Sequence, residues 1–316
     1  MKEIDVSIRQ DTLSRANNPE KPLSAEQRGQ KLKQLLGDIA LFINQELKQN
    51  VARPDQAALL HNDGTLDMKQ WLHVNDGPYA KEAEYKVHST FVFNKELEFS
   101  GLARQKSLSD NPLVQEQMIL EYHESKLRKD GEQAEMAITA LLYKFLRDDF
   151  IVVRSAKYDD YHAGVDMLII NKKTGEVVCG FDEVTDTSDG KRLKKKQNKV
   201  IDMALQGGAE VKYGLTFVKQ QLDKPMRLVK TDLNNLPTFY LPISKEDLRL
   251  LLNNMNYNIY EEPSETECEI YQKMLGYLRT QVNALQSRVM PTTISRHIKN
   301  FGNMLTELEQ KFYDQV

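Results

Sequence analysis

The sequence predicts a mixed α/β core with helical regions on both sides of it, and three features lead to this prediction. Apolar residues recur at helical spacing in residues 132–148, and three short runs with strand character follow them. A basic helical segment at 188–206 and a further apolar run at 213–218 complete the order α-β-β-β-α-β. Residues 24–110 form a mixed, partly helical region before this core, and residues 244–316 after it have an all-helical pattern.

The N-terminal part begins with a polar stretch. Residues 1–23 end in the letters NNPEKP and cannot bury enough apolar surface to order themselves, so a flexible lead is expected. Ser24, with Gln27 three residues later, is a capping-box signal that starts a helix. The apolar positions of this helix are Leu32, Leu35, Leu36, Ile39, Ile43 and Leu47. Residues 85–93 follow two turn signals and have strand character, which favours a strand there.

The predicted core spans residues 111–243. Its helices are expected at 111–129 and 132–148, and its first strands at 150–154, 164–170 and 177–185. A turn at 171–175 joins the second and third strands into a hairpin. After Phe239-Tyr240-Leu241, Ser244 gives a second helix-capping signal and starts the C-terminal helical region.

Composition excludes several classes of function. A net charge of -3 and an isoelectric point near 6.1 mean that any nucleic-acid binding must come from a local basic surface. Cys179 and Cys268 lie far apart, which argues against a disulfide framework or a structural zinc site. The N-terminus has no signal-peptide pattern and no run is long and apolar enough to span a membrane, so a cytoplasmic protein is expected. Neither a phosphate-binding loop nor a dinucleotide-binding motif occurs.

The hairpin brings two carboxylates together in either of two registers. With a two-residue turn at Thr174-Gly175, Asp166 lies directly opposite Glu183; with a four-residue turn, it lies diagonally to Glu183 on the same face. The separation is roughly 5 Å in the first case and 7 to 8 Å in the second. Two adjacent carboxylates repel each other unless a cation lies between them or one is protonated. Mg²⁺ or Mn²⁺ suits such oxygen ligands.

These elements resemble the PD-(D/E)XK nuclease superfamily, which implies a restriction-endonuclease-like fold. Glu135 lies on the helix before the strands, Asp166 matches the aspartate of the second strand, and Asp182-Glu183 matches the acidic position of the third. The resemblance covers about residues 130 to 220. It implies that Asp166 and Glu183 hold the metal, with Asp182 replacing Glu183 if a bulge intervenes. Glu135 would bind the metal or a water molecule.

The sequence departs from the family pattern at one position. Where the family has a lysine two residues after the acid, this chain has Thr185, or Val184 if Asp182 is the acid. Lysines of the following helix are the replacement candidates, with Lys194 favoured over Lys191 because it can point back toward the sheet. The same basic segment is the candidate contact for a phosphate backbone through Lys191, Arg192, Lys195 and Lys196.

The function implied by the resemblance is Mg²⁺- or Mn²⁺-dependent hydrolysis of phosphodiester bonds in DNA or RNA. Two alternatives remain open. The fold can serve as a catalytically inactive nucleic-acid-binding or assembly module, or the helical regions can form a homo-oligomer or a larger complex. For Asp182 and Glu183, the plainer interpretation is a solvated strand end before a helix, and for the basic segment a solvated helix face.

Overall fold

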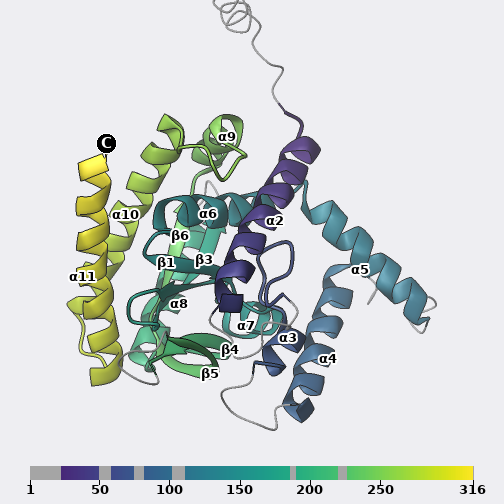
Figure 1. Cartoon of the computed structure of the whole chain (residues 1–316), viewed down its shortest axis with the longest axis horizontal. Coiled ribbons are helices and arrows are strands. Elements are labelled where there is room, and N and C mark those ends of the chain that lie inside the picture. The colour runs from purple at the N-terminus through teal and green to yellow at the C-terminus, as the bar shows by residue number, and fades with distance from the viewer. Residues whose placement is uncertain are drawn as a thin grey trace, which may run out of the picture.

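A computed structural model describes residues 23–49, 58–74, 82–101, 111–185, 190–219 and 226–315. The flexible lead expected at residues 1–23 lies almost wholly outside this range, with only residue 23 inside it. The described chain is mixed α/β, as the sequence predicts, and its helices surround a four-stranded sheet (Figure 1). No helix among the described residues is long and apolar enough to cross a lipid bilayer.

The central sheet has the strand order β1-β2-β3-β6. Its strands are β1 (Phe150–Arg154), β2 (Met167–Asn171), β3 (Val177–Thr185) and β6 (Thr238–Ile243). The first three strands form an antiparallel meander, and β6 runs parallel to β3. The strands predicted at 150–154, 164–170 and 177–185 are therefore confirmed within a few residues, and the sheet is mixed.

The strand expected at 213–218 exists but does not belong to this sheet. It is part of β4 (Ala209–Val218), which pairs with β5 (Arg227–Leu236) in a separate two-stranded antiparallel sheet. The place beside β3 is taken by β6 instead. Apolar strand patterns are alike in both sheets, so the sequence could not show which partner each strand would choose.

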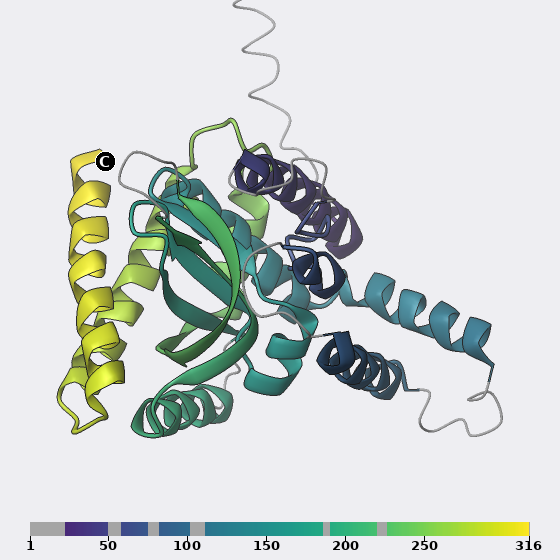
Figure 2. The ribbon, with the colours of Figure 1, turned by 60° about the horizontal axis from the view of Figure 1, so that its bottom comes forward.

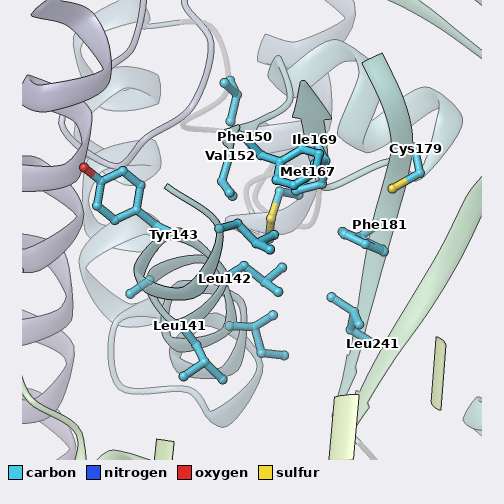
Figure 3. Close-up of a cluster of buried hydrophobic side chains, with 14 of the residues drawn as sticks. Leu141, Leu142, Tyr143, Phe150, Val152, Met167, Ile169, Cys179, Phe181 and Leu241 are labelled. Carbon is cyan, nitrogen blue, oxygen red and sulfur yellow. The ribbon is translucent and has the colours of Figure 1, made fainter. Parts of the chain in front are cut away.

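The two faces of the central sheet are covered by different elements. Helices α6 (Asp130–Leu146), α10 (Glu265–Gln286) and α11 (Thr292–Gln315) pack on one face, and α2 (Ala25–Gln49) lies outside α6. Figure 3 shows Leu142 of α6 on the side of the helix that faces Met167 and Phe181 of the sheet. The other face is covered by α8 (Lys191–Leu205) and the β4–β5 ribbon.

One hydrophobic core joins the N-terminal, central and C-terminal regions. Buried residues of α2, α6, the sheet, α10 and α11 belong to a single cluster. The predicted C-terminal helices are present as α9 (Lys245–Asn254), α10 and α11, and the Ser244 side chain accepts the Asp247 N–H at 2.9 Å. The capping box at Ser24 and Gln27 also forms, with reciprocal bonds of 3.2 and 2.9 Å.

The strand predicted at 85–93 is wrong, because these residues lie in helix α4 (Glu82–Phe99). His88 is the buried residue of this helix, stacked on Tyr158 at 3.6 Å between ring centroids. Such tertiary contacts override the weak strand preference of aromatic and β-branched residues. Helix α5 (Pro112–Lys126) follows, and Figure 2 shows α4 and α5 projecting away from the sheet. The remaining short helices are α3 (Met68–Leu72) and α7 (Lys157–Ala163).

Candidate acidic site

Asp166 and Glu183 meet at one end of the β2–β3 hairpin, as the sequence predicts. Asp166 directly precedes β2, and its Oδ2 accepts the Glu183 backbone N–H at 2.9 Å. The backbone N–H of Asp166 donates to the Phe181 carbonyl oxygen at 2.8 Å. The two residues are therefore held together by the backbone as well as by the register of the strands.

The register of the hairpin near Asp166 is neither of the two that the sequence allowed, because the observed pairing lies one residue from each of them. The turn has four residues, since Asn171 N–H donates to the Glu176 carbonyl at 2.9 Å. A bulge then shifts the pairing by one residue between Ile169 and Ile170, so that Met167 pairs with Phe181. The extra residue is Val178 of β3, between Val177 and Cys179. Asp166 lies before the first residue of β2, and its carboxylate reaches the Glu183 N–H.

Local backbone contacts fix the position of Asp166. Gly164 ends α7 in the left-handed region with a φ of 65°, a conformation that residues with a Cβ rarely adopt. Ser155, just after β1, donates its N–H to the Asp166 carbonyl at 2.9 Å and its hydroxyl to the Val165 carbonyl. A glycine is therefore required at the turn that delivers Asp166 to the end of the sheet.

Glu183 carries an unpaired oxygen. Its Oε2 is buried and has no hydrogen-bond partner among the described residues. Burial raises the pKa of Glu183 to about 8, with the charges of Glu135 and Asp182 adding to the rise and the hydrogen bond with Asp166 and the charge of Arg154 opposing it. Burial and the neighbouring Glu183 also raise the pKa of Asp166 well above its usual value. Both carboxyls therefore favour a bound proton or a cation over two adjacent negative charges.

Glu135 of the neighbouring helix α6 is the third carboxylate near Asp166 and Glu183. It lies on α6, and its Oε2 accepts from Nη2 of Arg154 at 3.1 Å. Arg154 is the last residue of β1, and its side chain is only 6% exposed. Burial raises the pKa of Glu135, while the charge of Arg154 opposes this rise. The structure thus brings Glu135, Asp166 and Glu183 to the same end of the sheet.

Asp182 points to the opposite face of the sheet from Glu183, because successive side chains of a strand alternate. It is buried and forms ion pairs with Lys196 and, at 3.7 Å, with Lys199 of α8. A bulge does intervene at Val178 and shifts the pairing by one residue, yet Asp182 and Glu183 do not exchange roles, because the carboxylate of Asp166 accepts the Glu183 N–H. Asp182 is thus part of the packing of α8 rather than of the Glu135 group.

The basic residues of α8 do not join the acidic group. Lys191, Lys194 and Lys195 are exposed along the helix, and Lys196 is held by Asp182. The side chain of Arg192 lies outside the described residues. Among the residues that the structure describes, no lysine, arginine or histidine forms an ion pair with Asp166 or Glu183.

Three charged residues near the site were missed by sequence reasoning. Arg154 contacts Glu135, and it also lies 3.7 Å from Glu132 Oε1 and 4.0 Å from Asp63 Oδ2. The signal for Arg154 was present, because a charged residue ends an otherwise apolar strand, Phe-Ile-Val-Val-Arg. Asp63 lies about a hundred residues before the hairpin, and no local pattern connects it with the site.

Two carboxylates of this site are the residues that could hold a divalent cation. In the described part of the chain, no three Asp, Glu, His or Cys side chains are grouped so as to hold a metal ion by themselves. Mg²⁺, however, is usually held by one or two carboxylates, and water and substrate phosphate complete its shell. Asp166, together with the unpaired Oε2 of Glu183, provides such a pair.

Comparisons of the chain with protein-family models, with curated proteins and with solved structures gave no match. The class of site is therefore defined by its own geometry. It is a partly buried carboxylate pair at the end of a mixed sheet, with a third carboxylate held by an arginine.

Proposed function

We propose that this chain is a metal-dependent nuclease of the PD-(D/E)XK type that hydrolyses phosphodiester bonds in DNA or RNA. The observation that carries the proposal is the meeting of Asp166 and Glu183 around a buried, unpaired carboxylate oxygen. An arrangement that raises the pKa of both groups costs stability and needs a functional reason. A bound cation is such a reason.

The architecture supports a restriction-endonuclease-like core. Helix α6 precedes an antiparallel meander, α8 follows β3, and β6 then adds to the sheet parallel to β3. This is the order α-β-β-β-α-β, except that the β4–β5 ribbon is inserted between α8 and β6. The acidic group lies at the end of β3 beside α6, as the resemblance implies for such a site.

Each acidic residue has a separate task in this proposal. Asp166 and Glu183 would hold Mg²⁺ or Mn²⁺, which supplies positive charge to a phosphate at the scissile bond. Asp166 is fixed by its bond to the Glu183 backbone N–H, so the pair needs little rearrangement to bind. Glu135, with 32% of its side chain exposed, can accept a proton from a water molecule that enters from solvent.

The nucleic acid would be contacted through exposed lysines of α8. Lys191, Lys194 and Lys195 form a basic surface on a chain that is acidic overall. Lys196 contributes less to this surface because it is paired with Asp182. Exposed Leu113 and Leu120 on α5 also support assembly into a homo-oligomer through the helical regions.

A catalytically inactive nucleic-acid-binding protein is the second candidate. It is favoured by Thr185, which takes the place of the family's lysine, and by α8, whose contacts to the sheet are made on the Asp182 face. Without an ammonium group near the scissile phosphate, one usual source of transition-state stabilisation is missing. The two candidates differ in whether the acidic group binds a cation and cuts its ligand.

The deciding experiment measures Mn²⁺ binding by calorimetry together with cleavage of single- and double-stranded DNA and RNA. Asp166→Asn is compared with Glu176→Gln, an exposed residue at the other end of the same hairpin. Loss of both binding and cleavage in Asp166→Asn alone supports the nuclease. Nucleic-acid binding without Mn²⁺ binding or cleavage in the wild type supports the second candidate.

A further inference from the structure

Arg154 joins three segments that are far apart in the sequence. Its backbone N–H donates to the Gly64 carbonyl at 3.2 Å, and its carbonyl accepts from Leu66 N–H at 3.0 Å. Its guanidinium reaches Glu135 of α6 and, through Nη1, the Asp63 carbonyl at 3.4 Å. A Cβ on Gly64 would touch the aliphatic part of the Arg154 side chain at 3.8 Å. Both the backbone and the side chain of Arg154 are therefore held in place by neighbouring segments.

The positively charged side chains lie beside some of the acidic residues of the site and not beside others. The guanidinium of Arg154 forms ion pairs with Glu135 at 3.1 Å, Glu132 at 3.7 Å and Asp63 at 4.0 Å. A second cation, Lys126 Nζ, lies 2.6 Å from Glu132 Oε2. Asp166 and Glu183 have no ion-pair partner in the described part of the chain. The ion pairs are thus confined to one half of the group, while the other half receives only the longer-range charge of Arg154 at Glu183.

We propose that Arg154 is a positioning residue that acts as the resident cation of the Glu132–Glu135–Asp63 half of the site. It thereby limits the site to one divalent cation, bound at Asp166 and Glu183. The use of that cation in hydrolysis rests on the proposed function, but the division of the site between one arginine and one metal ion is tested separately.

The chemistry of arginine suits this role. Its charge is permanent, and its planar fork presents several donors in fixed directions, so one side chain can serve three carboxylates. A lysine at this position would keep the charge but lose the fork. Because Arg154 holds Glu135 through Oε2, it also sets where that carboxylate stands relative to Asp166 and Glu183.

The test counts Mn²⁺ ions bound per chain, by calorimetry and by electron paramagnetic resonance of free Mn²⁺. The wild type, Arg154→Gln and Arg154→Lys are compared. We expect Arg154→Gln to bind one more Mn²⁺ than the wild type, because its carboxylates lose their resident cation. Arg154→Lys keeps the wild-type number. Equal numbers in Arg154→Gln and the wild type overturn the inference.

The result for the wild type decides the proposed function independently. One ion in the wild type and two in Arg154→Gln supports both proposals. None in the wild type contradicts both proposals, because the inference places one ion at Asp166 and Glu183. One ion in both proteins overturns the role of Arg154 alone and leaves the metal-dependent nuclease standing.

A second variant covers the case in which Arg154→Gln does not fold in metal-free buffer. The double variant Arg154→Gln/Glu135→Gln removes the cation together with one of its carboxylates, and it is expected to fold with or without Mn²⁺. The single variant should then regain its folded circular-dichroism spectrum only on refolding with Mn²⁺. A single variant that stays unfolded with Mn²⁺ while the double variant folds also overturns the inference.

Discussion

Asp182 and Glu183 are adjacent residues of β3, yet their carboxylates have opposite surroundings. Asp182 is buried against α8 and is satisfied by Lys196 and Lys199. Glu183 lies on the α6 face, and its Oε2 has no partner among the described residues. The satisfied carboxylate holds a helix in place, whereas the unsatisfied one is the proposed ligand of a cation. A buried charge by itself therefore does not indicate a functional site, and its partners must be known.

The largest expected effect separates the two residues by activity. Glu183→Gln should lower the cleavage rate at least about 100-fold, as is typical when a group that stabilises the transition state is removed. Asp182→Asn should stay within about tenfold of the wild type, because Asp182 faces α8. Single-turnover cleavage with saturating Mn²⁺ measures both. Equal losses in the two variants would show that the two faces of β3 do not differ in function.

The second-largest effect concerns stability, and here the change at Asp182 is expected to matter more than the change at Glu183. Asp182→Ala should lower the free energy of unfolding by about 2 kcal/mol, the range of charge-assisted hydrogen bonds. The loss stays below that of a fully buried pair because Lys196 and Lys199 are 34% and 40% exposed. Glu183→Gln should change stability by less than about 1 kcal/mol, since it removes repulsion from Asp166. Urea titrations monitored by circular dichroism give both values.

A third prediction uses pH. The pKa of Glu183 is raised to about 8 from an ordinary value of 4.5, so the folded protein binds a proton more tightly than the unfolded chain. The stability linked to this proton is complete below about pH 4.5 and is lost as the pH rises toward 8. Without metal, the melting temperature of the wild type should therefore fall over this window more steeply than that of Glu183→Gln. Parallel pH profiles for the two proteins would contradict the raised pKa.

The smallest effect concerns the lysines of α8. Lys195→Ala should weaken nucleic-acid binding severalfold, reduce the salt slope by about one and leave the melting temperature unchanged. Lys196→Ala should lower the melting temperature, because it leaves Asp182 with only the 3.7 Å contact to Lys199. Fluorescence anisotropy at several salt concentrations, beside thermal melts, distinguishes a lysine that binds ligand from one that supports the fold.

The elements of the core could be predicted because they are governed by local patterns. Apolar periodicity located α6, β1, β2 and β3, and the side-chain rules for capping located the start of α2 and of α9. The same rules failed for residues 85–93, which form a helix because His88 packs on Tyr158 and Tyr213. They also assigned 213–218 to the central sheet, where β6 stands instead.

The sequence by itself determined that Asp166 and Glu183 belong to facing strands of one hairpin, because the turn at 171–175 leaves few registers. The observed register is not one of the two it allowed, and the two residues meet because Asp166 lies before β2 and its carboxylate accepts the Glu183 N–H. Only the tertiary structure decided which charges accompany them. Arg154 reaches Glu135, and Asp63 joins from a distant loop, while Lys196 turns to Asp182. The reason is physical: strand pairing is set over a few neighbouring residues, but the partner of a long charged side chain depends on which segments the whole core packs together.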